Sequence, residues 1–176
     1  MSARTSFALP LYSVCALILI LSGCAKIPAP APITPLPADI HGRLLATEPG
    51  QRWQVMFDWH AASPNQGRMR LTHASTHRIV ELRWEKAHLW LRDNQATTPD
   101  WRAIGAGELA RHGISLLPSE LSAFFSGRVP AGFVQIKTNQ WQSKRNDSTI
   151  RVKWMGHRLN ITDIKNGRQA IFIIHD

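Results

Sequence analysis

Apolar and polar residues alternate along much of the chain after residue 50. In QRWQVMFDW, residues 51–59, an apolar residue stands at every second position from Trp53 onward. A period of two is typical of β-strands with one buried face. The same period predicts half-buried strands in GRMRLTH (67–73), RIVELRW (78–84), AHLWLRD (87–93), STIRVKW (148–154) and HRLNITDI (157–164).

Short turn-forming segments separate these strands. Glycine, proline, asparagine and charged residues cluster at 48–50, 63–67, 85–86, 145–148, 155–156 and 165–167. Strands that follow one another with such short connections form antiparallel meanders. We therefore expect a mainly β (α+β) domain built on a single curved antiparallel sheet.

The middle of the chain has a helical pattern instead. Residues 107–112 predict a short helix ended by Gly113, and LLPSELSAFFSGRVP, residues 116–130, predicts a longer one. Pro118 suits its first turn, and Gly127 suits its C-terminal stop. One apolar stripe is formed by Leu117, Leu121, Phe124 and Phe125. This helix is expected to lie as a lid over one face or mouth of the sheet.

The amino-terminal segment predicts a secretion signal. Residues 7–21 are almost entirely apolar, which is short for a membrane span of about 20 residues and suits the central region of a signal peptide. The following Leu21-Ser22-Gly23-Cys24 resembles the bacterial lipobox, which implies cleavage before Cys24 and acylation of its thiol. The alternative is an incidental cysteine behind an ordinary signal peptide. Residues 1–23 are therefore assigned to a lipoprotein signal peptide.

The mature chain is expected to be tethered to a membrane. Cys15 lies in the signal, so Cys24 has no cysteine partner for a disulfide. Residues 24–39 are proline-rich, as expected of an extended tether, and residues 40–176 form one domain. Ala25 replaces the aspartate that, in the sorting pathway this motif resembles, retains lipoproteins in the inner membrane. The resemblance implies an anchor in the outer membrane, facing the periplasm.

The net charge of the chain limits the classes of partner that it is expected to bind. The formal charge is +9, and the signal carries Arg4 and no acid, which leaves +8. In a periplasmic compartment this favours acidic partners or anionic lipid head groups over nucleic acid. A solvated basic surface without a partner is the alternative.

Several segments fall in the order and spacing of one family. They are HGRLL (41–45), RWQVMFDWHA (52–61), GRMRLTH, ELRW followed by AHLWLRD, and GISLLPSELSAFFSGRVP (113–130). The sequence resembles the LolB family of outer-membrane lipoprotein receptors, best over residues 40–130. That resemblance implies an unclosed antiparallel β-barrel with a helical lid over an apolar cavity, similar to the LolA carrier.

The resemblance also implies a function. A monomeric receptor would accept lipoproteins from a LolA-like periplasmic carrier by burying their acyl chains, and would pass them into the outer membrane. This transfer makes and breaks no covalent bond, so no catalytic residue, metal or cofactor is expected. Inward-facing apolar residues are the candidates for the cavity: Trp53, Val55, Phe57, Trp59, Met69, Leu71, Val80, Leu82, Trp84, Leu121, Phe124 and Phe125. The alternative is that these side chains fill the barrel as ordinary core.

One loop departs from the family pattern. The family projects a leucine after the strand that matches GRMRLT, whereas this chain has Ser75 within His73, Ala74, Ser75, Thr76, His77 and Arg78. Insertion of lipoproteins is therefore an open question, and an accessory lipoprotein that binds lipid or a protein without insertion is the second hypothesis. The two loop histidines are four apart but lack a third ligand, so no metal site is expected. Asp58 and Glu81 are expected to be outward solubility charges.

Overall fold

The computed structural model describes residues 33, 35–111, 115–145 and 147–175. The predicted signal peptide and Cys24 lie outside this range. Within it, no helix is long and apolar enough to cross a membrane. The elements are β1 (Asp39–Glu48), β2 (Gln51–Ser63), β3 (Gln66–Thr72), β4 (Ile79–Glu85), β5 (His88–Asp93), β6 (Arg102–Ile104), α2 (Ala106–Arg111), α3 (Pro118–Phe125), β7 (Val134–Lys137), β8 (Gln140–Arg145), β9 (Ser148–Met155), β10 (Arg158–Asp163) and β11 (Arg168–His175).

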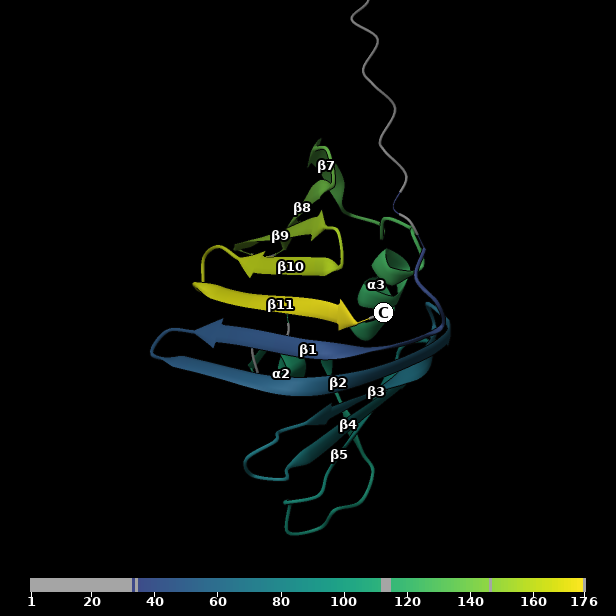
Figure 1. Ribbon diagram of the computed structural model, residues 1–176, viewed down its shortest axis with the longest axis vertical. Helices are drawn as coiled ribbons and strands as arrows, with labels where there is room; N and C mark the ends of the chain where they lie inside the picture. The colour runs from purple at the N-terminus through teal and green to yellow at the C-terminus, as the bar shows by residue number, and fades with distance from the viewer. Residues whose placement is uncertain (1–32, 34, 112–114, 146, 176) are drawn as a thin grey trace, which may run out of the picture.

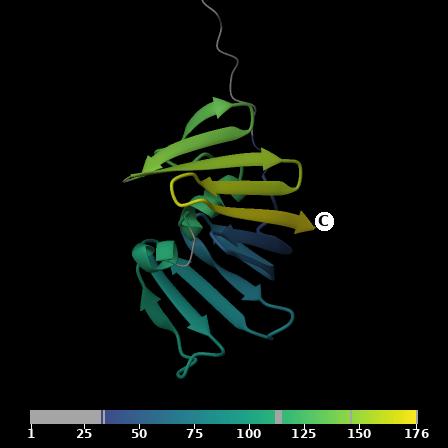
Figure 2. The same ribbon diagram turned by 90° about the vertical axis from the view of Figure 1, so that its left-hand side faces the viewer.

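All eleven strands belong to one antiparallel sheet with the order β6-β5-β4-β3-β2-β1-β11-β10-β9-β8-β7. β1 lies at the centre and pairs with both β2 and β11. The strands that precede α2 therefore form one arm of the sheet and the later strands form the other (Figures 1 and 2). The two outermost strands, β6 and β7, do not pair with each other in the described structure. This confirms the predicted curved, unclosed antiparallel sheet with helices inserted midway.

The central strand β1 was not predicted from its periodicity. Its inner positions include Gly42, Leu44 and Ala46, so two of them lack a bulky apolar side chain. A Cβ atom on Gly42 would lie 2.0 Å from the Ile173 carbonyl oxygen and 2.8 Å from the Phe57 ring. The close approach of β11 therefore requires glycine here, and this requirement hides the alternating pattern.

An aromatic cluster joins the two arms. Trp59 lies 4.6 Å from Trp84 and 5.1 Å from Phe125, measured between ring centroids. Phe172 of β11 contacts Phe57 at 5.3 Å and Phe125 at 5.8 Å. All five side chains are buried. Helix α3 therefore packs into the core of the sheet, with Phe125 at the centre of the cluster.

Polar contacts fix the start of α3. The Leu117 N–H donates to Glu120 Oε2 at 2.9 Å, which satisfies one free donor of the first turn. Arg145 of β8 donates to both carboxylate oxygens of Glu120, one of them at 2.9 Å. A bidentate ion pair thus joins the helix to the second arm of the sheet.

The end of α3 contacts the chain that precedes β1. The Leu36 N–H donates to the Phe125 carbonyl oxygen at 2.7 Å, and Ile33 is only 7% exposed. Gly127 has a φ of +78°, and a Cβ there would lie 2.7 Å from the Ile33 carbonyl oxygen. Ile33 and Leu36 were assigned to the tether, and in the structure this last part of the segment packs against the domain.

The buried carboxylate of Asp163 makes the stability of the domain depend on pH. Asp163 is 5% exposed. It accepts hydrogen bonds from the Ser148 hydroxyl, from Ser115 at 3.3 Å and from the Asn166 side chain at 2.8 Å. Burial acts to raise the pKa of Asp163, but these hydrogen bonds outweigh it, and the pKa lies below its usual value.

Because the folded-state pKa is depressed, the ionised Asp163 stabilises the fold above the unfolded-state pKa. That stabilisation is lost as the pH falls through the folded-state pKa. Asp163→Asn is expected to lower the free energy of unfolding by about 1–3 kcal/mol at pH 7. The difference in the free energy of unfolding between the variant and the wild type should disappear in acid, as measured by urea denaturation across pH 2–7. Asp147→Asn, at an exposed ion pair with Lys165, is the control and should change stability little. A gap that stays constant with pH would contradict this assignment.

Candidate functional site

The inner face of the first arm holds an open cavity of about 610 Å³. This volume falls in the range of ligand pockets, about 300–1,000 Å³. Its wall is formed by apolar side chains of β2 to β5 and by Leu109 of α2, and its rim by polar side chains. The lining residues are Glu48, Gln51, Trp53, Val55, Leu71, His73, Thr76, Arg78, Val80, Leu82, Leu91, Asp93, Gln95, Arg102 and Leu109.

A smaller hollow of about 40 Å³ adjoins this cavity. Trp53 and Leu71 line both spaces, and the smaller one extends toward α3 and β11. This volume is far below the range of about 300–1,000 Å³ typical of ligand pockets, so the hollow is too small for an acyl chain. The larger cavity is therefore the candidate site.

The predicted cavity residues divide into three groups. Trp53, Val55, Leu71, Val80 and Leu82 line the large cavity. Met69 and Leu121 line the small hollow. The remaining five are buried aromatic residues, of which Trp59 and Trp84 also border a hollow on the outer face of the first arm: Phe57, Trp59, Trp84, Phe124 and Phe125. The open part of the inner face is thus mainly aliphatic, and the aromatic part is filled.

Two apolar residues of the cavity wall, Leu91 and Leu109, are absent from the set predicted from the sequence. Leu91 faces inward from β5, as the alternation in residues 87–93 indicated, but it was not assigned to the cavity. Leu109 belongs to α2 and is 1% exposed. Its sequence signal was weak because a six-residue helix shows too little of a 3.6-residue period.

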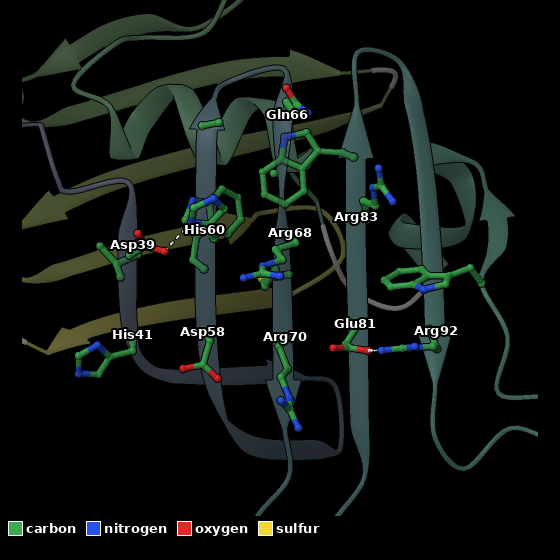
Figure 3. Close-up of a pocket in the computed structure, with 17 residues that line it drawn as sticks. Asp39, His41, Asp58, His60, Gln66, Arg68, Arg70, Glu81, Arg83 and Arg92 are labelled. Atoms are coloured by element: carbon green, nitrogen blue, oxygen red, sulfur yellow. Dashed lines mark hydrogen bonds and ion pairs between the residues drawn. The ribbon is translucent and has the colours of Figure 1, made fainter.

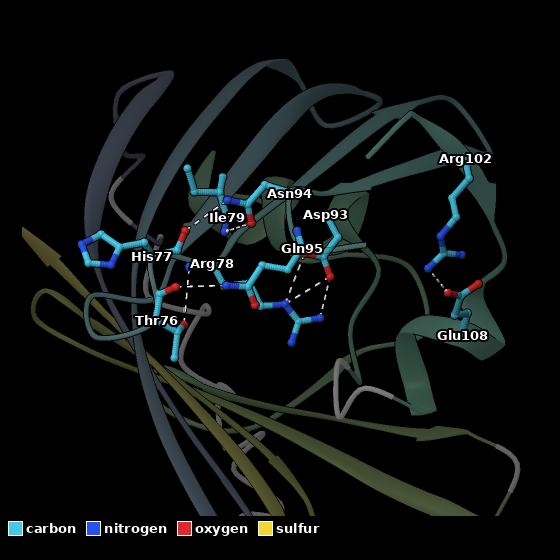
Figure 4. A network of polar contacts seen from close by, with 9 residues as sticks. All are labelled: Thr76, His77, Arg78, Ile79, Asp93, Asn94, Gln95, Arg102 and Glu108. Atoms are coloured by element: carbon cyan, nitrogen blue, oxygen red, sulfur yellow. Dashed lines mark hydrogen bonds and ion pairs between the residues drawn. The ribbon is translucent and has the colours of Figure 1, made fainter. Parts of the chain in front are cut away.

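Helix α2, and not α3, borders the large cavity. Leu109 forms part of its wall, while the α3 residues expected to form a lid lie in the core or at the small hollow. Glu108 of α2 pairs with Arg102 of β6 at 2.6 Å (Figure 4). This ion pair links the helix to the last strand of the first arm, next to the cavity rim.

The other side of the rim is the predicted insertion loop, which is held by a polar network (Figure 4). Arg78 donates to Asp93 through Nε at 3.1 Å and Nη2 at 2.5 Å. The hydrogen bond from the Arg78 guanidinium holds the pKa of Asp93 below its usual value. Gln95 Nε2 donates to the Thr76 carbonyl oxygen at 3.0 Å. These contacts fix the carboxyl-terminal half of the loop to the end of β5 and to the residues that follow it.

Ser75 lies exposed in this loop, with its hydroxyl 3.2 Å from His73 Nδ1. None of the six residues from 73 to 78 has a bulky aliphatic or aromatic hydrocarbon side chain. Within the described chain, no group of three or more histidine, cysteine, aspartate or glutamate residues could hold a metal ion. The loop therefore presents polar and basic groups at the cavity mouth.

The outer face of the first arm carries a second hollow, of about 810 Å³ (Figure 3). The strand registers place Asp58, Arg70, Glu81 and Arg92 in one row across β2 to β5. Arg92 donates to Glu81 at 2.7 Å and lies 4.9 Å from the Trp101 ring centroid. Asp58 and Glu81 thus face outward as predicted, within a hollow whose alternating charges suit water and not acyl chains.

The chain shows little sequence similarity to known proteins. No family model and no curated protein matches the sequence. Among solved structures, the chain is similar to a LolA superfamily protein from Nitrosomonas europaea, with 8% identity and a TM-score of 0.42. The match covers 81% of this chain and 86% of that one. A likeness at this level does not assign a function to this chain.

Proposed function

We propose that the protein is an outer-membrane lipoprotein receptor that accepts lipoprotein acyl chains from a periplasmic carrier and transfers them into the membrane. The open cavity on the inner face carries this proposal. It combines a mainly aliphatic wall with a volume of about 610 Å³, next to a core of buried aromatic side chains. Acylation of Cys24 would anchor the receptor itself.

The energetics favour such a cavity for transfer. Each methylene group buried from water contributes about 0.8 kcal/mol, so an exposed acyl chain costs many kcal/mol. The wall residues Val55, Leu71 and Leu91 can remove part of that surface from water. A volume of this size holds a chain without the dense packing of a protein interior, so the bilayer can still compete for it.

The polar mouth favours a second candidate function. Ser75 exposes no apolar surface, and Arg78 and Asp93 close a polar network beside it. A receptor of this kind could bind acyl chains and lack insertion activity. The protein would then be an accessory lipoprotein that holds lipid or lipoprotein clients.

The decisive experiment separates uptake from insertion. Residues 25–176 contain every described contact, and this anchor-free chain would be mixed with a carrier–lipoprotein complex. Movement of the lipoprotein onto the chain is the expected result, followed by insertion when liposomes are added. Uptake without insertion would select the accessory function. No uptake would overturn the proposed receptor.

Ser75→Leu is expected to raise the rate of insertion into liposomes by about tenfold without changing uptake. A leucine side chain can enter the lipid interface and contributes about 1.5–3 kcal/mol when fully buried. Insertion would be measured by flotation of the lipoprotein with the liposomes. Asn65→Leu, at the exposed turn between β2 and β3, is the matched control. Equal stimulation by both variants would show a general effect of added apolar surface.

A further inference from the structure

The positive charge of the protein is concentrated in its second arm. Residues 128–175 contain nine lysines and arginines and two acidic residues, Asp147 and Asp163. Asp163 is buried on the inner side, and Asp147 pairs with Lys165 at 3.1 Å in the turns at one end of the arm. The outward-facing positions of the described strands β7 to β10 therefore carry no carboxylate.

These cations share a face with exposed apolar residues, and we name this area the β7 surface. The register places Val134 opposite Gln142, and Gln142 opposite Arg151, so all three face the same side. Val134 is 64% and Ile136 is 40% exposed. The strand registers place Val134, Lys137, Lys144, Arg151 and Lys153 on this face, and the exposed Ile136 lies beside them at the irregularity between Gln135 and Lys137; these six residues form the β7 surface.

The β7 surface also lies at the edge of the sheet. β7 pairs with β8 on one side and ends the sheet on the other. Exposed apolar residues on an edge strand invite association, and proteins usually avoid them. Their combination with lysine and arginine fits a surface that is apolar beneath and negatively charged at its face, as an anionic bilayer is.

The path of the chain brings this surface near the predicted anchor. Ile33 packs beside Gly127, at the end of α3 from which the chain continues to β7. β7 lies at the extremity of the molecule on this side, opposite the arm that carries the cavity (Figures 1 and 2). Cys24 precedes Ile33 by nine residues, and an extended chain of that length spans at most about 30 Å. An acylated Cys24 would thus hold the bilayer close to this end.

We infer that the β7 surface binds the anionic lipid surface of the membrane in which the protein is anchored. Val134 and Ile136 enter the interface, while Lys144, Arg151 and Lys153 contact lipid phosphates. This contact fixes one orientation of the domain, in which a carrier can reach the cavity. The orientation rests on the proposed anchor at Cys24, whereas the lipid contact itself does not need the anchor.

The test uses anchor-free residues 25–176 and sedimentation with two kinds of vesicle. One is phosphatidylcholine alone, and the other contains an equal amount of phosphatidylglycerol. We expect binding to the anionic vesicles that falls as salt is added. Lys144→Glu combined with Lys153→Glu should lower the partition coefficient at least tenfold, because each basic residue near the membrane surface adds electrostatic attraction to the anionic lipids. Val134→Ser combined with Ile136→Ser should lower it by about tenfold with an unchanged salt dependence.

The matched control is Arg52→Glu combined with Lys86→Glu, which makes the same change of charge at exposed positions of the first arm. Unchanged tryptophan fluorescence and thermal midpoint would show that each variant is folded. The inference is overturned if the wild-type chain ignores anionic vesicles, or if the control pair loses as much binding as the β7 pair.

Uptake of lipoprotein from the carrier is measured on the same variants. The β7 variants should take up lipoprotein like the wild type, since the cavity is untouched. A wild-type chain that binds vesicles but takes up no lipoprotein would overturn the receptor function alone. A chain that takes up lipoprotein but ignores vesicles would overturn the β7 surface alone.

Discussion

Val80→Trp is expected to reduce uptake of lipoprotein acyl chains by roughly fiftyfold while leaving the domain folded. Val80 is half-buried, lines the large cavity and lies opposite Leu71 in the sheet register. An indole ring at this position would occupy space that about three methylene groups of an acyl chain would fill. At about 0.8 kcal/mol each, their loss amounts to about 2.4 kcal/mol, which is close to fiftyfold in affinity.

Equilibrium binding of a fluorescent lipopeptide to residues 25–176 would measure this effect. Ile79→Trp is the matched control, because it adds a ring at the neighbouring position, which faces the other side of β4. It should leave lipopeptide affinity within about twofold. If Val80→Trp folds and binds as the wild type does, acyl chains do not occupy this cavity.

Trp84→Ala is expected to lower the free energy of unfolding by about 3–5 kcal/mol. Trp84 is 1% exposed, and its ring lies 4.6 Å from that of Trp59. Its indole N–H donates to the Pro64 carbonyl oxygen at 3.1 Å. Loss of this ring would remove buried apolar surface and a hydrogen bond, and would leave a cavity that the sheet can close only in part.

Urea denaturation followed by circular dichroism would measure the change. Trp101→Ala is the control, because Trp101 is 42% exposed, and its loss should cost less than about 1 kcal/mol. A small effect of Trp84→Ala would show that the ring borders open space after all. The two substitutions together therefore distinguish the filled part of the inner face from the open part.

The division of the inner face has a structural cause. Helix α3 places Phe124 and Phe125 against the aromatic residues of the sheet and excludes open space there. Helix α2 reaches the inner face near Leu109 and leaves a cavity between itself and the strands. One insertion thus supplies both the core of the domain and one wall of its candidate site.

The sequence by itself determined six of the eleven strands and the longer helix of this protein. A period of two placed β2, β3, β4, β5, β9 and β10, since side chains of a strand alternate between the two faces of a sheet. The stripe of Leu121, Phe124 and Phe125 and the glycine at residue 127 placed α3. These signals are local, so they can be read from a few neighbouring residues.

Only the tertiary structure decided which inward residues line the cavity. Strand β4 places three apolar side chains on its inner face, those of Val80, Leu82 and Trp84. Val80 nevertheless borders open space, whereas Trp84 packs between Trp59 and the β2–β3 turn. The period of a strand fixes the face of each side chain but not what covers it. That depends on α2, α3 and β11, whose positions follow from contacts between residues far apart in the sequence.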